Sequence, residues 1–366
     1  MKIGIIGTRG FPDLQGGIET HCMELYTRIA RRYDIQFTVY RRKPYLNEKN
    51  RNVIYPNIRF VDLYVPKSKN FETFLHSFFA TIHALFQRYD LVHFHNTGPG
   101  FFIPVMKLSR AKIVFSYHNI SYTQKKWGKL ARNFLFFSEK VSLKYSDYVI
   151  FISDFIRKEI TGRFPVKKWQ VISNGVNIPV RCPNSDYIRS LGLEENKYII
   201  SVGRFLEEKG FDYLITAFKK TGIMDYKLVL VGDTDYETDY SNRIRDFAAQ
   251  NGVVLTGFVR GNKLHQVYSF ARLFIISSFA EGHPIALLEA MSYNLDVLAS
   301  DIQANLEVGL AKSDYFKVGD DEDLKEKILN KLTVSRERNY SDLLMSKYNW
   351  DTIANETYSI YNNLIK

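Results

Sequence analysis

The chain of 366 residues is too long for one ordinary domain, and its composition, 45% hydrophobic and 24% charged, is typical of a globular protein. No run approaches the ~18 apolar residues that a membrane-spanning helix needs. Met1-Lys2 leads into a short glycine-rich segment that does not resemble a secretory signal. These features argue against an integral membrane protein and a secreted one, and we expect a cytoplasmic protein.

The net charge of +11 is unevenly distributed along the chain. Residues 1–180 hold 28 Lys and Arg against 12 Asp and Glu, whereas the remainder holds 22 against 27. Such asymmetry indicates an anionic partner, either nucleic acid, a membrane surface or an acidic substrate. Because no nucleic-acid recognition motif accompanies the charge, we expect no nucleic-acid partner.

The first half of the chain alternates apolar strand patterns with helical ones. Strands are expected at residues 2–6, 35–40, 58–65, 91–94, 112–117 and 148–152. Helices are expected at residues 18–31, 71–89 and 129–145. Alternation of this kind is typical of a parallel sheet with helices on both faces.

The pattern pauses at a turn-rich segment, residues 173–179, and then restarts. Strands follow at 198–202, 227–231, 253–255, 273–277 and 296–299, and helices at 211–219, 240–250, 285–293 and beyond 322. We therefore predict an α/β protein of two Rossmann-like, doubly wound parallel-sheet domains facing across a cleft. The predicted domains are residues 1–178 and 179–347, and a final helix at 348–366 is expected to pack back on the first domain.

The strongest local motif lies between the strand at 273–277 and the helix at 285–293. Glu281 stands on the loop, Gly282 and Pro284 favour a close backbone approach followed by a helix start, and Glu289 lies one turn into the helix. Amides at a helix start bind anions and hydroxyls, and a carboxylate there can accept both ribose hydroxyls. Read alone, the two glutamates are equally compatible with an ordinary loop and helix surface.

A second motif follows the strand at 198–202. Arg204 and Lys209 lie on the loop, and a helix begins just after Gly210. A guanidinium and an ammonium converging on a helix start suit a diphosphate. Such clusters are often only surface charge, and the neighbouring motif is what favours the binding interpretation.

These motifs together resemble the retaining glycosyltransferase family 4, which has the GT-B fold. The resemblance rests on the Arg-x4-Lys-Gly and Glu-x7-Glu spacings and on Ser173-Asn174-Gly175-Val176-Asn177, which is similar to the linker of that family. Residues 7–12 and 16–20, the segment 118–128 and residues 301–308 are similar to a subgroup that includes bacterial polysaccharide rhamnosyltransferases.

The resemblance implies a set of site residues. Arg204 and Lys209 would hold the donor diphosphate, Glu281 the transferred sugar and Glu289 the ribose, while His118 would bond the sugar from the first domain. The catalytic residues implied are Glu281, His118, Arg204 and Lys209. The donor-binding residues implied are Gly16, Gly17, Arg204, Lys209, Glu281, Gly282, His283, Pro284, Ile285 and Glu289.

The sequence departs from the family at three places. Tyr293-Asn294-Leu295 replaces a glycine-containing turn, Asn119-Ile120-Ser121 differs from the residues that usually follow the histidine, and His283 replaces a phenylalanine. The second departure leaves the identity of the sugar open.

We expect the nucleotide sugar to be a substrate, with neither a cofactor nor a metal ion. Asp233-Thr234-Asp235 has the spacing of a metal motif but stands on an unsuitable loop. The expected reaction moves rhamnose or another hexose, with retention, to a polyprenyl-diphosphate-linked or saccharide acceptor in bacterial surface polysaccharide synthesis.

Rival interpretations are a sugar-nucleotide epimerase or phosphorylase on the same fold, and an NAD-dependent dehydrogenase. The dehydrogenase is disfavoured because Gly4, Gly7 and Gly10 do not have the Gly-x-Gly-x-x-Gly spacing. The basic, aromatic-rich segments 71–79 and 127–137 suggest peripheral docking on the anionic inner face of the cytoplasmic membrane, or else simply belong to the core.

Overall fold

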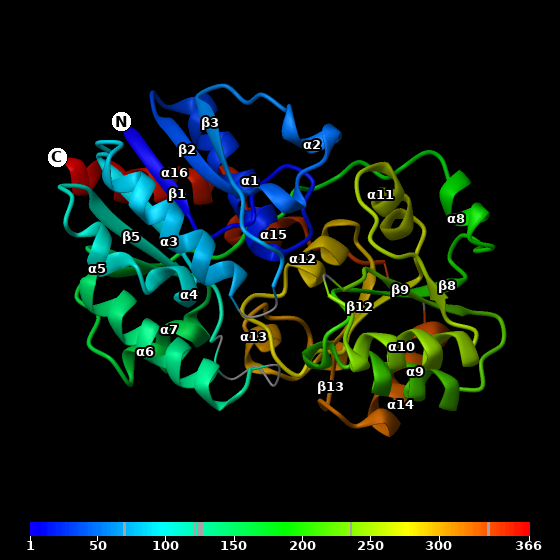
Figure 1. The fold of residues 1–366 in the computed structure, drawn as a ribbon. Helices are drawn as coiled ribbons and strands as arrows, with labels where there is room; N and C mark the ends of the chain where they lie inside the picture. The colour runs from blue at the N-terminus through cyan, green and yellow to red at the C-terminus, as the bar shows by residue number, and fades with distance from the viewer. Residues whose placement is uncertain (69–70, 121, 123–126, 235, 335–336) are drawn as a thin grey trace. The chain divides into compact units, whose positions relative to one another are not determined.

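The computed structural model describes residues 1–68, 71–120, 122, 127–234, 236–334 and 337–366. It divides the chain into two compact units (Figure 1). Unit 1 comprises Met1–Gly175 and Tyr348–Lys366, and unit 2 comprises Val176–Lys347. The sequence prediction placed this boundary at residue 178.

Unit 1 is built on a seven-stranded sheet of order β3-β2-β1-β4-β5-β6-β7, in which every pairing is parallel. Its strands are β1 (Lys2–Ile6), β2 (Gln36–Arg42), β3 (Ile58–Leu63), β4 (Leu91–His95), β5 (Lys112–Tyr117), β6 (Tyr148–Phe151) and β7 (Trp169–Val171). Its helices are α1 (Gly17–Arg32), α2 (Glu48–Arg51), α3 (Glu72–Leu85), α4 (Thr97–Gly100), α5 (Ile103–Met106), α6 (Lys129–Tyr145), α7 (Asp154–Thr161) and α16 (Trp350–Ile365), with a short 3-10 turn at Lys43–Tyr45.

Two cores lie on the two faces of this sheet. One core joins the sheet to α1 and α16 and includes Leu25, Tyr26, Ile353 and Tyr361. The other joins it to α3, α5, α6 and α7. Because both faces are covered, the central strands are continuous apolar runs, as in β1 with Ile3, Ile5 and Ile6 fully buried.

Unit 2 is built on a six-stranded parallel sheet of order β10-β9-β8-β11-β12-β13. Its strands are β8 (Tyr198–Val202), β9 (Lys227–Val231), β10 (Val254–Leu255), β11 (Leu273–Ile276), β12 (Asp296–Ser300) and β13 (Tyr315–Phe316). Its helices are α8 (Asp186–Ser190), α9 (Phe211–Lys220), α10 (Asp239–Gln250), α11 (Asn262–Ser269), α12 (Ile285–Ser292), α13 (Gln303–Leu306), α14 (Asp321–Thr333) and α15 (Ser341–Lys347), with 3-10 turns at Glu207–Lys209 and Lys312–Asp314. A core on one face joins the sheet to α9, α10 and α14.

The strand order reverses once in each sheet, between β1 and β4 in unit 1 and between β8 and β11 in unit 2. Connections leave in opposite directions at such a point, so a crevice opens at the carboxyl ends of the two strands, where ligands of such sheets bind. The structure confirms the predicted class, two α/β units each built on a parallel sheet. Among the described helices, none combines the length and hydropathy that a bilayer crossing requires.

Candidate functional site

Lys209 and Glu281 meet at the strand reversal of unit 2. Lys209 ends the 3-10 turn that follows β8, and Glu281 lies on the loop that follows β11, the strand next to β8. The Nζ atom of Lys209 is 2.5 Å from Oε1 of Glu281. The side chains are only 21% and 11% exposed, so the ion pair is partly shielded from water and stronger than a surface pair.

Hydrogen bonds fix the two loops to each other. Ser278 Oγ donates to Oε1 of Glu281 at 2.6 Å, and Ser277 Oγ donates to the carbonyl of Lys209 at 2.8 Å. The amide of Phe279 donates to the carbonyl of Glu208 at 2.8 Å. The hydrogen bonds between the two loops therefore help to position the ion pair, in addition to the attraction between its charges.

Gly210 makes the close approach of these loops feasible. Its φ of 62° is left-handed, and a Cβ at this position would lie 2.5 Å from the carbonyl oxygen of Ser277. A side chain would thus push the two loops apart. Arg204 lies two residues after β8 on the same loop as Lys209, and its side chain is half-buried.

Glu289 lies on α12, whose first residue, Ile285, directly follows Pro284. Its Oε2 accepts a hydrogen bond from the hydroxyl of Tyr268 at 2.9 Å. Burial, and then the charge of Glu289, raises the pKa of Tyr268, so this hydroxyl stays protonated and donates. Tyr268 in turn stacks on Tyr293, with ring centroids 5.1 Å apart.

Gly282 and His283 occupy the loop between Glu281 and α12, and both are partly buried. The carbonyl of His283 accepts the amide of Ile285 at 3.0 Å, which turns the chain into the helix. The structure thus brings Lys209 and Glu281 into contact, whereas Glu289 contacts Tyr268 on α11. Sequence reasoning missed Tyr268, which belongs to no motif and meets Glu289 only through tertiary packing. It also assigned no role to Ser278, although this residue lies within the motif, because its contact with Glu281 depends on the geometry of the loop.

In unit 1, Gly16 and Gly17 stand where the loop after β1 enters α1. Gly16 has a φ of 145°, and a Cβ there would collide with the carboxylate of Glu19. That buried carboxylate accepts the amide of Arg9 at 3.1 Å. The glycine therefore lets the loop turn back against a fixed carboxylate at the strand reversal of unit 1.

His118 follows β5 and belongs to a group of buried histidines. Its Nε2 is 2.8 Å from Nδ1 of His95, and Nε2 of His95 is 2.5 Å from the hydroxyl of Tyr26. Burial lowers the pKa of His93, His95 and His118, and it lowers that of His21 to about 4. The imidazoles are thus neutral at physiological pH. Sequence reasoning singled out His118 but missed its partners, which come from separate elements.

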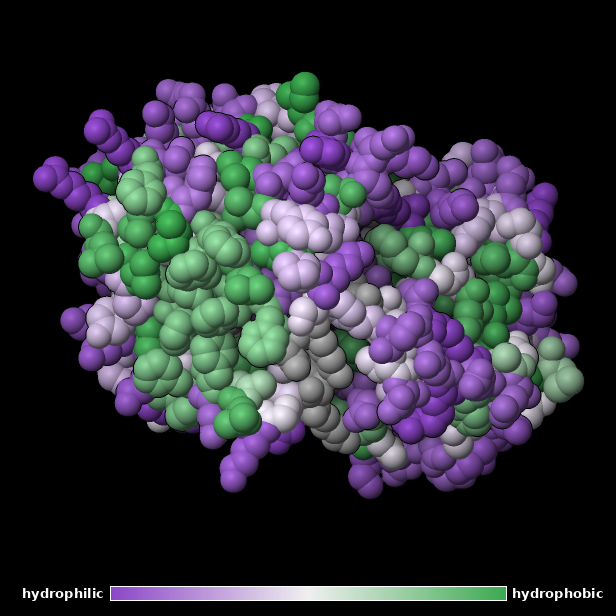
Figure 2. Space-filling model, in the orientation of Figure 1, coloured by the Kyte–Doolittle hydropathy of each residue, from purple (hydrophilic) through white to green (hydrophobic). Residues whose placement is uncertain are grey.

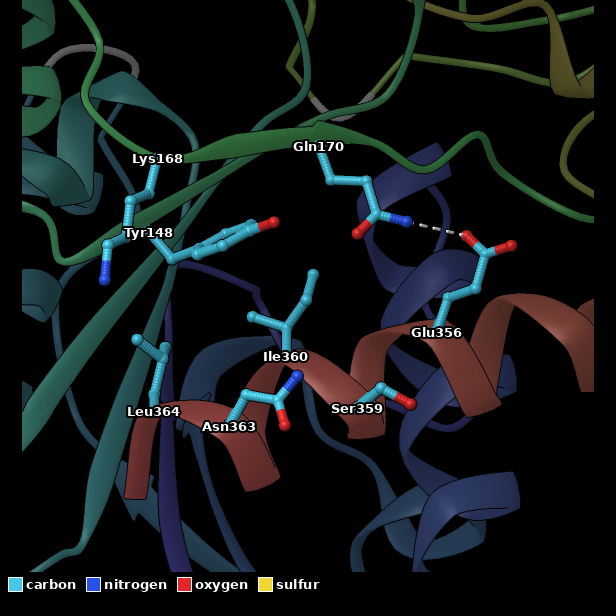
Figure 3. A pocket seen from close by; sticks show the side chains of 8 residues that line it. All are labelled: Tyr148, Lys168, Gln170, Glu356, Ser359, Ile360, Asn363 and Leu364. Atoms are coloured by element: carbon cyan, nitrogen blue, oxygen red, sulfur yellow. Dashed lines mark hydrogen bonds between the residues drawn. The ribbon is translucent and has the colours of Figure 1, made fainter. Parts of the chain in front are cut away.

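Parts of the sequence predictions lie outside the described residues, namely Ser121 and residues 123–126 of the segment 118–128, and Asp235. Asp233 forms an ion pair with Arg245, with Oδ1 and Nη2 2.6 Å apart. A separate cavity of about 250 Å³ lies in unit 1 between β6, β7 and α16 (Figure 3). Gln170 and Glu356 are hydrogen-bonded at its wall, and none of its lining residues is a predicted site residue.

The fold and the placement of these residues define a two-unit α/β protein with a candidate ligand site at each strand reversal. Two family models match the chain: Glycosyltransferase Family 4 over residues 15–179, and Glycosyl transferases group 1 over residues 184–341. Together these regions cover most of the chain. Both models describe glycosyltransferases, so each half of the chain is assigned to a glycosyltransferase family model.

Similar proteins agree with this assignment. An uncharacterized glycosyltransferase of Methanocaldococcus jannaschii is 30% identical over 61% of this chain and 62% of its own length. An O-antigen chain mannosyltransferase of Salmonella typhimurium is 28% identical over 58% of this chain and 59% of its own length. The matched part of the chain thus spans about three fifths of these two relatives.

Among solved structures, a sucrose-phosphate synthase from Thermosynechococcus elongatus superposes with a TM-score of 0.84 at 21% identity, covering 99% of this chain and 98% of the other. The Anabaena protein HepE in complex with UDP and glucose gives 0.79 at 17% identity, with 99% of each chain covered. These likenesses show the shared fold.

Proposed function

We propose that this protein is a retaining glycosyltransferase that moves a hexose, such as rhamnose, from a nucleotide diphosphate to a saccharide or polyprenyl-diphosphate-linked acceptor. The observation that carries the proposal is the Lys209–Glu281 ion pair at the strand reversal of unit 2. A cation and a carboxylate placed side by side suit a ligand that carries a diphosphate beside a polyhydroxylated ring. The relative named for O-antigen synthesis supports a surface polysaccharide as the product, and the HepE complex with UDP and glucose supports a nucleotide-sugar donor.

In this proposal the charges of unit 2 stabilise the leaving group. Lys209 and Arg204 neutralise the diphosphate as the glycosidic bond breaks, which is the role a divalent cation has in other transferases, so no metal is needed there. Glu289, oriented by Tyr268, accepts the ribose hydroxyls. Glu281 and the amides around Gly282 and His283 hold the transferred sugar.

Unit 1 contributes the acceptor side in this scheme. The Nε2 atom of His118 is bonded to His95, and Nδ1 makes no hydrogen bond within the described part of the chain. Nδ1 is therefore the atom that we assign to a sugar hydroxyl. The loop at Gly16 and Gly17 would approach the donor, and the leaving phosphate would take the acceptor proton during attack on the same face of the sugar.

A panel of UDP-, GDP-, dTDP- and ADP-sugars in thermal-shift assays tests the donor. We expect one nucleotide class to raise the melting temperature by several degrees. Lys209→Met removes a charge aimed at the leaving group, so it should reduce kcat by about 10²–10³-fold. Lys219→Met, an exposed lysine on α9, is the matched control and should behave as wild type.

Stabilisation by NAD alone would contradict the proposal and favour a dehydrogenase. Conversion of the sugar nucleotide without an acceptor would favour an epimerase, and a requirement for inorganic phosphate would favour a phosphorylase. If Lys209→Met were as active as the control Lys219→Met, the ion pair would have no role in the mechanism.

We also propose that unit 1 docks on an anionic membrane. Figure 2 shows hydrophobic residues gathered over the part of unit 1 that Figure 1 shows as α3 to α6. Exposed members of this apolar patch are Phe78, Phe79, Leu108, Leu130, Phe136 and Phe137. They are 41–87% exposed, although Phe74 of α3 packs against the core.

The charges around the patch match anionic lipid. The exposed face of α6 carries Lys129, Arg132, Lys140 and Lys144, whereas Glu139, the acid of that helix, is buried. Glu72 on α3 is buried and paired with Arg42 at 2.7 Å. Both helices therefore present apolar groups without an exposed carboxylate, and α6 adds cationic groups, as peripheral membrane helices do.

Vesicle flotation tests the docking. We expect binding to phosphatidylglycerol-containing vesicles to exceed binding to phosphatidylcholine alone and to weaken with salt. Phe136→Ser with Phe137→Ser should reduce binding about tenfold or more, because each inserted ring contributes roughly 1.5–3 kcal/mol. Phe258→Ser, an exposed aromatic residue of unit 2, is the control. Equal binding to both vesicle types would contradict the proposal.

A further inference from the structure

Three histidines converge at the strand reversal of unit 1. His21 lies on α1, His95 is the last residue of β4, and His118 follows β5 directly. The register pairs His95 with Ser116, so His118, two residues further on, points to the same face of the sheet. The side chains are buried, and one nitrogen of each lies within 4.8 Å of the others.

The spacing of the rings matches that of ligands on one metal ion. The ring centroids are 5.0 Å apart for His21 and His118, 5.1 Å for His95 and His118, and 5.6 Å for His21 and His95. Imidazoles on a tetrahedral zinc ion, with Zn–N bonds of about 2.0–2.1 Å, place their centroids roughly 5 Å apart. The three rings therefore lie at separations compatible with a shared ion.

The nitrogens of His95 and His118 require only a small adjustment, and the three ligand nitrogens lie within 4.8 Å of one another. His95 Nδ1 and His118 Nε2 are 2.8 Å apart, whereas two nitrogens on one tetrahedral zinc lie roughly 3.3 Å apart. If these two nitrogens moved apart by about half an ångström, a metal bond to each could replace the hydrogen bond between them. His21 would have to move toward the same ion.

The Nε2 atom of His21 provides independent evidence that this group of histidines binds a ligand. Its Nδ1 is 2.8 Å from Oδ1 of Asn174, an acceptor, so the proton resides on Nδ1 and Nε2 carries a lone pair. That Nε2 atom is buried and has no hydrogen-bond partner among the described residues. Buried ring nitrogens nearly always have one, and a lone pair without a donor calls for a proton donor or a cation.

Two of the three rings also form a hydrogen bond through the nitrogen that would not bind the metal, namely Nδ1 of His21 and Nε2 of His95. Histidines that bind a metal generally use their other nitrogen in a hydrogen bond, which fixes the orientation of the ring. Asn174 does this for His21, and the hydroxyl of Tyr26 does it for His95 at 2.5 Å.

We propose that unit 1 binds one divalent transition-metal ion, zinc or a similar imidazole-preferring ion, through His21 Nε2, His95 Nδ1 and His118 Nε2. Three protein ligands leave a fourth position for water or for an anionic oxygen of a substrate. The set of three imidazoles, without a carboxylate, selects against Mg²⁺, Ca²⁺ and Mn²⁺. This site shares His118 with the proposed glycosyl transfer, whereas Arg204 and Lys209 belong to unit 2.

Cobalt titration of the chelator-treated, full-length protein tests the site. We expect one equivalent of Co²⁺ to give the intense visible bands of tetrahedral coordination and Zn²⁺ to displace it, whereas Mg²⁺ should not. His21→Gln, His95→Gln and His118→Gln should each weaken binding at least 100-fold. His76→Gln, a buried histidine on α3 outside the cluster, is the matched control and should bind as wild type.

Two measurements do not depend on the folding of those variants. X-ray absorption of the zinc-loaded wild-type protein should show three imidazole ligands. Asn174→Ala leaves all three ligands in place and should weaken zinc binding about 10–100-fold. Absence of stoichiometric binding, fewer than two imidazoles, or equal binding by the cluster variants and wild type would overturn the proposal. Donor binding, measured separately on the same samples, distinguishes this failure from failure of the proposed function.

Discussion

At the residue scale, the chain keeps several ionisable groups away from water. His76 on α3 is fully buried, and its pKa is lowered well below the ordinary value by burial and then by the charge of Arg42. Arg42 is itself paired with buried Glu72. Unit 1 is therefore folded around a histidine that must remain neutral.

This arrangement predicts acid sensitivity. As pH falls below about 6.5, the unfolded chain binds a proton at His76 before the folded chain does, so the free energy of unfolding decreases. His76→Leu removes this proton uptake and should flatten the decrease between pH 6.5 and 5 by up to about 1.4 kcal/mol per pH unit. Urea unfolding at several pH values measures it. The same slope in the variant and the wild type would contradict the assignment.

The candidate site could be predicted from sequence only where a motif carries it. Arg204, Lys209, Glu281 and Glu289 stand on recognisable strand-loop-helix segments, and the two motifs together, with the family resemblance, singled them out. The residues that orient them, such as Tyr268, are brought in by tertiary packing, which local spacing does not encode. His21 and His95 were missed for the same reason.

At the element scale, buried apolar strands and long helices were predictable, whereas a short edge strand and short helices were not. The expected strand at 112–117 and helix at 129–145 have these bounds in β5 and α6, whereas the expected helix at 71–89 ends at Leu85. No expectation covered β7, α7 or α11. These elements have three to eight residues, too few for apolar periodicity to stand out, and packing against neighbours decides their structure.

The loop after β8 provides a matched test of backbone geometry. Gly210 and Gly222 both have left-handed φ, at 62° and 67°, but a Cβ at Gly222 would meet nothing within 4 Å. Gly222→Ala should cost about 1 kcal/mol for the backbone alone, and Gly210→Ala roughly 1–2 kcal/mol more. Urea unfolding measures both.

The two variants should also differ in their affinity for the donor. Gly210→Ala should weaken it because Lys209 is the preceding residue, while Gly222→Ala should leave it unchanged. Equal effects of the two substitutions on stability would show that the contact between the loops is unimportant.

At the scale of the whole molecule, α16 completes a unit from which it is distant in sequence. Tyr358 stacks on Tyr33 of unit 1 at a centroid distance of 3.5 Å, and the hydroxyl of Tyr361 lies 2.6 Å from Nδ1 of His93. Arg32 forms an ion pair with Asp351 at 2.7 Å. The apolar face of α1 is buried partly by this helix.

Truncation after Lys347 should therefore destabilise unit 1 selectively. The shortened chain exposes the surfaces that Ile353, Ile360 and Tyr361 cover, at roughly 25 cal/mol per Å² of apolar area. Limited proteolysis with mass spectrometry should show cleavage within residues 1–175 and protection within 176–347. Equal protection of the two units would contradict this role of α16.

The return of α16 also sets the order in which the protein can fold on the ribosome. Unit 2 is a continuous segment and can fold as soon as it has left the exit tunnel, whereas residues 1–175 of unit 1 lack α16 until residues 348–366 have also emerged. Until then, the apolar residues of α1 that α16 buries in the finished structure remain partly exposed. A nascent chain would therefore need a holding chaperone for residues 1–175 and not for unit 2.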